Sequence, residues 1–96
     1  MLWQEIDHEE SQSFLISEIE ELDPNGFYKN ILSDNGFVDL IYEITNRQWD
    51  WSINELQDFY SAEITSQEHK FYAENKNKYF ALASAYLDAL YFHKDR

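Results

Sequence analysis

The sequence contains no cysteine, only two glycines and a single proline in 96 residues. The lack of cysteine excludes disulfides and thiolate chemistry, although a chain of this length can close one core without such cross-links. Two glycines leave little backbone freedom for a phosphate-binding loop, and no nucleotide, zinc-protease, EF-hand or serine-hydrolase motif occurs. We therefore expect a protein that is not an enzyme and that carries no cofactor.

Long apolar runs are also missing. The most apolar stretch, residues 81–92, contains Ser84 and Asp88 and is too short to span a bilayer. The first ten residues, MLWQEIDHEE, are acidic, whereas a signal peptide begins with basic residues and continues into an apolar region. These features predict a cytoplasmic protein that does not enter the membrane.

Basic residues are scarce in the first two thirds of the chain. Residues 1–68 contain sixteen acidic and two basic side chains, a net charge of −14, whereas residues 69–96 contain three acidic and five basic side chains, a net +2; together they give −12. Affinity for phosphates depends mainly on Lys and Arg, so this balance disfavours nucleic-acid binding. It instead predicts an acidic surface that faces a basic protein.

What the sequence has in abundance is apolar and aromatic side chains, which make up 44% and 18% of the residues. That content is too high for a disordered acidic chain. The length suits one domain, and neither a repeat nor a linker divides it. We therefore predict a single domain over residues 1–96.

Helix-capping signals divide the chain. Residues 52–55 and 65–68 both match the S/T-x-x-E capping box and predict two helix starts, the second opening a long C-terminal helix that reaches His93. Turn residues at 23–26 and 34–36 predict helix ends on either side of a short helix over 27–32. Ahead of them, Leu15, Ile16, Ile19 and Leu22 recur at helical spacing.

Residues 37–47 are ambiguous. Phe37, Leu40, Ile41 and Ile44 fit a helix, while Val38, Leu40, Tyr42 and Ile44 fit a strand. No second alternating run is evident that could pair with such a strand, so the helix is preferred. The sequence thus predicts an all-α bundle of four to five helices; the alternative is an α+β fold if 37–44 is a strand.

The three histidines, His8, His69 and His93, do not have metal-ligand spacing. Glu5 and His8 form one Glu-x-x-His pair, but helical di-iron sites need two such pairs and the other histidines lack one. We expect no metal site.

Acidic residues recur one helical turn apart, as in Glu18 with Glu21 and Asp39 with Glu43. Such like-charged pairs cost about 0.2–0.5 kcal/mol each, and only Glu43 has an opposite charge in helical register, at Arg47. A solubilising surface needs less charge than this. We interpret the clusters as a binding surface.

Aromatic residues next to the acids supply candidate anchors. Trp49 and Trp51 bracket Asp50, and Trp and Tyr are typical anchors of protein interfaces, although any one of them also suits core packing. The predicted partner-binding residues are Glu18, Glu21, Asp39, Glu43, Trp49, Asp50, Trp51, Glu55, Asp58 and Tyr60.

In physical character the chain resembles the small acidic immunity proteins that neutralise bacteriocins and contact-dependent-inhibition toxins, although no motif ties it to one family. This resemblance implies a cognate nuclease toxin, bound through its basic cleft or a neighbouring surface. Two alternatives stay open: a phage-type DNA mimic that blocks a restriction or RNA-guided nuclease, and a non-enzymatic regulatory or adaptor protein.

Overall fold

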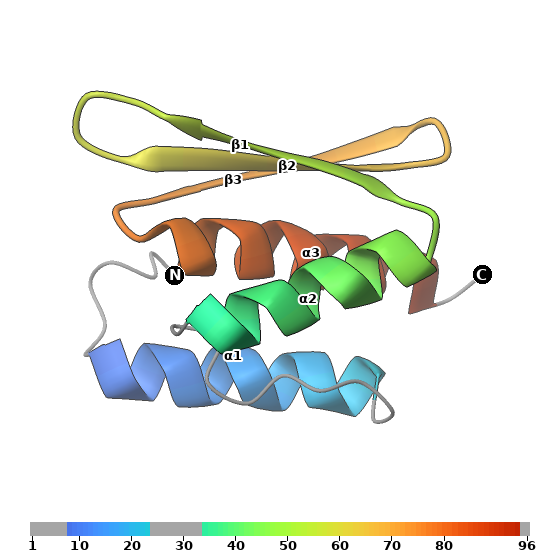
Figure 1. Ribbon diagram of the computed structural model, residues 1–96. Helices are drawn as coiled ribbons and strands as arrows, with labels where there is room; N and C mark the ends of the chain where they lie inside the picture. The colour runs from blue at the N-terminus through green and yellow to red at the C-terminus, as the bar shows by residue number, and fades with distance from the viewer. Residues whose placement is uncertain (1–7, 24–33, 95–96) are drawn as a thin grey trace.

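The computed structural model describes residues 8–23 and 34–94, with side chains from residue 14 onward. The elements in chain order are α1 (His8–Leu22), α2 (Asp34–Asn46), β1 (Asp50–Glu55), β2 (Tyr60–Ser66), β3 (His69–Asn75) and α3 (Lys78–Lys94) (Figure 1). The predicted short helix over 27–32 lies outside the described residues.

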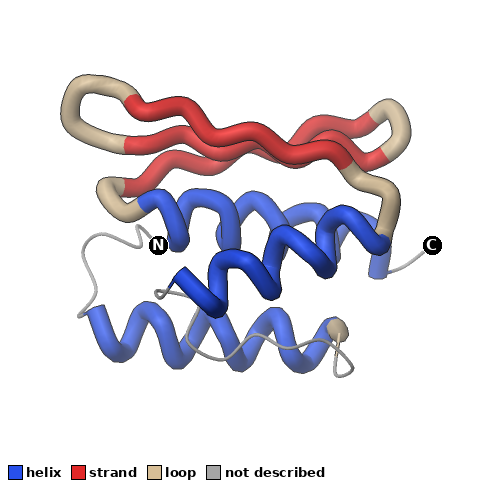
Figure 2. The backbone as a smooth tube through the Cα atoms, viewed as in Figure 1, coloured by secondary structure: helices blue, strands red, loops and turns tan. Residues whose placement is uncertain are grey.

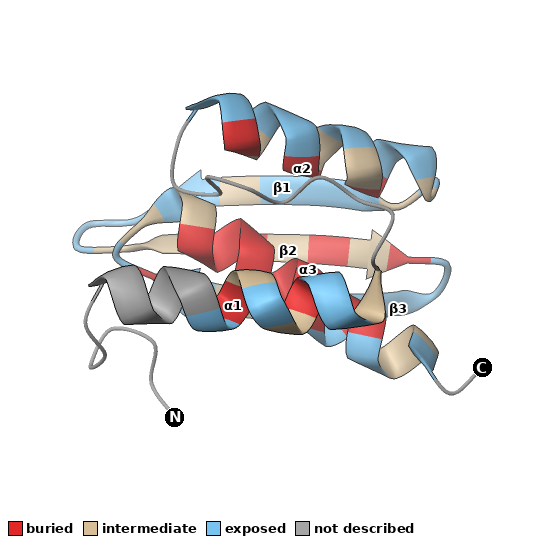
Figure 3. Cartoon of the chain, turned by 90° about the horizontal axis from the view of Figure 1, so that it is seen from below, coloured by how far each residue is buried: buried red, intermediate tan, exposed pale blue. Residues whose placement is uncertain are grey.

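The strands form one antiparallel sheet in the order β1-β2-β3, and the described helices all lie on one side of it (Figures 1 and 2). Helix α3 packs on β2 and β3, and α1 packs on α3. Helix α2 lies beside α3 and next to the edge strand β1 (Figure 3). The opposite face of the sheet is left without a covering element in the described part of the chain.

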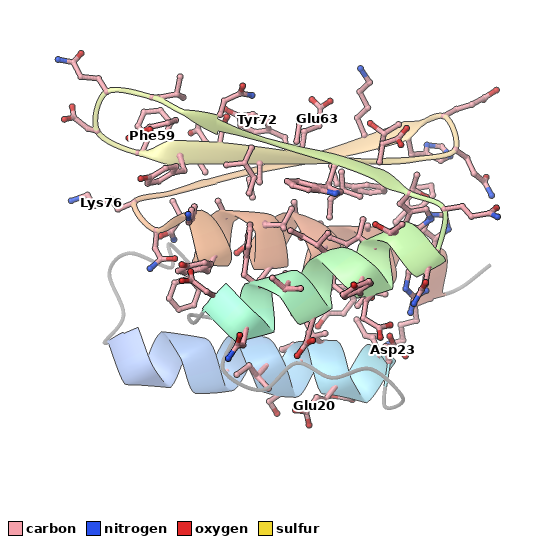
Figure 4. The ribbon with its side chains drawn as sticks, viewed as in Figure 1. Glu20, Asp23, Phe59, Glu63, Tyr72 and Lys76 are labelled. Atoms are coloured by element: carbon pink, nitrogen blue, oxygen red, sulfur yellow. The ribbon has the colours of Figure 1, made fainter. Side chains whose placement is uncertain are left out.

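The strand register decides which side chains meet the helices. Ile64 on the central strand stands opposite Trp51 and Phe71, and these positions face the helices. The alternate positions point to the uncovered side of the sheet, and Figure 4 shows Glu63 and Tyr72 projecting from that outer side. The two faces follow the apolar-in, polar-out alternation of a sheet with one covered side.

Helix α3 is the centre of the core. Most of its residues from Phe80 to Leu90 are buried, because the sheet covers one side and α1 covers another (Figure 3). Small side chains at Ala81, Ala83, Ala85 and Ala89 let both neighbours approach closely. Leu15 and Ile19 of α1, Leu40 and Ile44 of α2 and Ile64 of β2 complete the cluster.

The prediction of an all-α helical bundle is wrong, since the fold is α+β with a three-stranded sheet. The two capping-box matches lie in the sheet: residues 52–55 are in β1, and 65–68 end β2 and form the turn into β3. Ser, Thr and Glu also suit strands and turns, and here Gln67 adopts a positive φ of 59° in the two-residue hairpin turn. The alternation of Tyr60, Ala62 and Ile64 signals the strand, but alanine makes it a weak signal.

The helical interpretation of residues 37–47 is confirmed in α2, so the α+β fold arises from other segments than 37–44. The predicted stop at 34–36 is wrong, because these residues form the first turn of α2. Asp34 there is favourably placed at the positive end of the helix dipole. The long C-terminal helix exists but begins only at Lys78, where the Asn77 side chain accepts hydrogen bonds from the backbone N–H groups of Tyr79 and Phe80.

We predict that Ser84→Ala stabilises the protein. Ser84 is buried in α3, and its hydroxyl has no hydrogen-bond partner. Alanine removes this unmet polar group and has the higher helix propensity, so the free energy of unfolding should rise by about 1–2 kcal/mol in urea titrations. Ser66→Ala is the contrasting variant: it removes the hydrogen bond between Ser66 and His93 and should lower stability. A destabilised Ser84→Ala protein would contradict the prediction.

Candidate partner-binding surface

The outer side of α2 exposes apolar side chains. Leu40 and Ile44 are fully buried and fix the rotation of the helix. Val38 and Tyr42, one turn apart, consequently face solvent with 48% and 65% of their surface exposed. Tyr42 is the most exposed large apolar residue of the described chain.

Strand β1 continues this exposed apolar area. Trp51 lies at the sheet edge beside α2, 38% exposed, with its ring edge-on to Phe37 at a centroid distance of 6.5 Å. Glu55 is also exposed and lies four residues after Trp51, so the two side chains are on the same side of the strand. We call this surface the α2–β1 face; it consists of Val38, Asp39, Tyr42 and Glu43 of α2 with Trp51 and Glu55 of β1.

Its carboxylates have no counter-charge. Among the side chains that the structure describes, in 14–23 and 34–94, Arg47 forms a salt bridge with Asp23 at 2.9 Å and Lys70 forms one with Glu63 at 3.8 Å. Neither reaches Asp39, Glu43 or Glu55. The α2–β1 face therefore combines exposed aromatic surface with uncompensated negative charge.

Arg47 does not form the ion pair with Glu43 that the helical spacing suggests. It lies one residue beyond the end of α2, where it bridges to Asp23 and donates from Nε to the Tyr86 hydroxyl at 2.9 Å. Burial alone lowers the pKa of Arg47, but Tyr86 and Asp23 outweigh burial and raise it above its ordinary value. This cation is used to join α1, α2 and α3.

Trp49 is partly buried and packs against the core. Its ring stacks on His93 at 5.1 Å and meets Tyr86 edge-on at 6.0 Å, while the Arg47 guanidinium lies 5.2 Å from its centre. Tyr60 is likewise half-buried against the core. For these two predicted anchors, the core-packing interpretation describes their position.

The remaining predicted acids are dispersed. Glu18 and Glu21 lie on α1, where Glu18 accepts a hydrogen bond from Tyr91 of α3. Asp50 is on the outer side of the sheet, in register with Thr65, and Asp58 lies in the loop between β1 and β2. Of the ten predicted residues, four lie on the two elements of the α2–β1 face: Asp39 and Glu43 on α2, and Trp51 and Glu55 on β1.

Sequence reasoning missed Val38 and Tyr42. Both fit only the strand interpretation of residues 37–44, so a helix necessarily turns them away from its apolar stripe. The available signal was that, once residues 37–47 are taken as a helix, these two apolar residues lie outside its buried apolar stripe.

Tyrosine hydroxyls in the described part of the chain bind carboxylates, a feature that residue spacing does not reveal. Tyr72 donates to Glu74 at 2.6 Å, Tyr79 donates to Asp34, and Tyr91 donates to Glu18. In each case the hydrogen bond to the carboxylate is the main cause that raises the pKa of the tyrosine above its ordinary value.

Among the described side chains, Ser66 and His93 form a hydroxyl–imidazole hydrogen bond, the kind of contact by which a base can activate a nucleophile. Ser66 has no exposed surface, so its oxygen cannot meet a substrate in this conformation. The described residues also contain no group of three or more His, Asp or Glu that could hold a metal ion. None of the described helices is both long enough and apolar enough to cross a membrane.

Comparisons with protein-family models, with curated proteins and with solved structures found no significant match. The geometry and charge of the chain itself therefore indicate what it binds.

Proposed function

We propose that this protein binds a basic protein partner through the α2–β1 face. The observation that carries the proposal is the exposed Tyr42, flanked by Asp39 and Glu43, which no described cation pairs. Trp51 at the neighbouring strand edge adds a second aromatic side chain. Apolar anchors among charges of one sign are the usual composition of an electrostatically guided interface.

The two kinds of side chain would act at different stages of binding. The net charge of −12 attracts a basic protein over about one Debye length and so increases the association rate. Tyr42, Val38 and Trp51 then lose water against the partner and supply most of the affinity. Such a complex forms fast and persists at high salt.

The specific form that we propose is an inhibitor of the immunity-protein kind, with a nuclease toxin as the partner. A nuclease carries a basic surface for phosphates, which an acidic protein can occupy. The DNA-mimic alternative requires carboxylates in a double row along a rod. The chain measures 33 × 26 × 26 Å along its principal axes, and its grouped acids share their face with aromatic residues, so that alternative has less support.

The proposal is tested by neutralising the face and comparing it with an equal change elsewhere. The face variant carries Asp39→Asn, Glu43→Gln and Glu55→Gln. The control carries Glu20→Gln, Glu21→Gln and Glu68→Gln, which are exposed and lie on α1 and in the β2–β3 turn; Figure 4 shows Glu20 pointing away from the body. Both variants raise the net charge by three units.

Each tagged protein is incubated with lysate of the cells that make it and washed at high salt, and the retained protein is identified and purified for titration. We expect one basic protein to be retained. The face variant should bind it about tenfold more weakly, whereas the affinity of the control should stay almost unchanged. Equal weakening in both variants, or retention of many basic proteins that all wash off, would contradict a dedicated binding face.

A further inference from the structure

A small hollow lies at one end of the sheet, where the loop between β1 and β2 approaches the loop between β3 and α3. Its volume is about 210 Å³, and it is lined by Asp58, Phe59, Glu74, Asn75 and Lys76. Figure 4 shows Phe59 and Lys76 at this end of the molecule. The hollow is smaller than the ~300–1,000 Å³ of sites for whole small molecules, so its size suits a single side chain. We call it the hairpin hollow.

The wall of the hairpin hollow has the chemistry that recognises a guanidinium group. Asp58 of the β1–β2 loop and Glu74 of strand β3 supply two carboxylates, and Phe59 adds an aromatic ring. A guanidinium is planar, donates several hydrogen bonds to carboxylates at fixed angles and stacks on aromatic faces. Lys76 is the one cation of the wall, and Figure 4 shows its side chain extending outward from the ribbon.

Hydrogen bonds hold the wall in place before any ligand arrives. Glu74 accepts the Tyr72 hydroxyl on Oε2, which orients its carboxylate. The Leu56 N–H donates to the Phe59 carbonyl at 2.8 Å and closes the β1–β2 loop. In the other loop, the Asn77 N–H donates to Asn75 Oδ1 at 2.9 Å. A wall fixed in this way loses little conformational freedom on binding.

The hairpin hollow lies across the width of the sheet from the α2–β1 face. Glu55 on edge strand β1 stands in register with Tyr60 of β2, which stands in register with Asn75 on the opposite edge strand β3. Two inter-strand spacings, about 10 Å in all, therefore separate the two edges. A partner that covers this end of the sheet can contact the face and place one long side chain in the hollow. We propose that the hairpin hollow binds an arginine side chain of the basic partner, an inference that rests on the proposed function.

The test uses N-acetyl-arginine amide as the probe, because it presents the side chain without a partner protein. Its neutral isostere, N-acetyl-citrulline amide, is the matched control, titrated at equal ionic strength. Backbone amide signals of the ¹⁵N-labelled full chain are followed by NMR. We expect saturable shifts at residues 56–59 and 74–77 with the arginine probe and none with citrulline.

Variants of the wall give changes of opposite sign. Asp58→Asn and Glu74→Gln should each weaken probe binding about two- to fivefold, whereas Lys76→Gln should strengthen it by a similar factor. Equal shifts with citrulline, shifts elsewhere in the chain, or binding unchanged by both carboxylate variants would overturn the inference.

The outcome is separable from that for the α2–β1 face. If arginine fails to bind while the face variant still loses its partner, the inference fails and the proposed function stands. If arginine binds while the face variant keeps its partner, the hollow binds guanidinium groups and the proposed function falls.

Discussion

Arg47→Met is expected to lower the free energy of unfolding by about 3 kcal/mol, because it removes one member of a partly buried ion pair. The side chains of Arg47 and Asp23 are only 32% and 13% exposed. Methionine keeps most of the volume but leaves the Asp23 carboxylate without this cation and the Tyr86 hydroxyl without this donor. Figure 4 shows Asp23 where the end of α1 lies near α2, so the loss should be felt by the whole helical layer. Urea unfolding followed by circular dichroism measures the change.

Lys70→Met is the matched control for this prediction. It removes the same kind of charge from the outer side of the sheet, where Lys70 and Glu63 form a longer and more exposed ion pair. Its effect should stay within about 0.5 kcal/mol. If Arg47→Met were no more destabilising than Lys70→Met, Arg47 would not be joining the helices as described.

Tyr42→Ala is expected to weaken binding of the partner about 30-fold with no loss of stability. Tyr42 is 65% exposed and contributes little to the core, so truncation removes surface that only a partner can bury. An aromatic anchor of this kind is typically worth about 2 kcal/mol or more in an interface. Titration of the purified partner by calorimetry measures the loss, mainly as faster dissociation.

Tyr91→Ala tests whether position, rather than residue type, explains the result. Tyr91 is 43% exposed but lies on α3, where its hydroxyl donates to Glu18 of α1, and it belongs neither to the α2–β1 face nor to the hairpin hollow. Its removal should leave partner affinity within about twofold of the unchanged protein. Weakening by Tyr91→Ala alone would move the binding surface to the side of the molecule formed by α1 and α3.

The helices could be predicted from the sequence and the sheet could not. Leu15 and Ile19, and Leu40 and Ile44, recur every four residues and leave a clear helical stripe. The inner positions of the sheet are instead filled by weak signals: Ala62 and Ala73 face each other, and Ser66 and Asn75 are buried polar residues. When small and polar residues occupy the inner positions, the apolar–polar alternation of a strand is hard to distinguish from a polar segment. In addition, the two chance capping-box matches favoured a helical interpretation.

The same error dispersed part of the predicted site. A helix beginning at 52–55 would carry Glu55 and Asp58 one turn apart, but a strand followed by a loop places them in the α2–β1 face and the hairpin hollow instead. Trp49 and Trp51 both lie on the helix side of the sheet, as residues two apart at a strand start do, and Asp50 between them faces the outer side. Trp49 contacts Tyr86 of α3, while Trp51 is at the sheet edge beside α2. Where the local structure was right, as for Asp39 and Glu43 on α2, the prediction put the residues together.

The phenol–carboxylate pairs described above have a consequence for the electric field around the protein. A lysine or arginine that fixes a carboxylate also cancels its charge, whereas a tyrosine hydroxyl orients Asp34, Glu18 or Glu74 and leaves the full negative charge in place. The chain can thus fix the positions of these surface carboxylates without weakening the negative electrostatic potential around them. It joins neighbouring elements through its acidic side chains and keeps nearly all of their charge directed at the solvent.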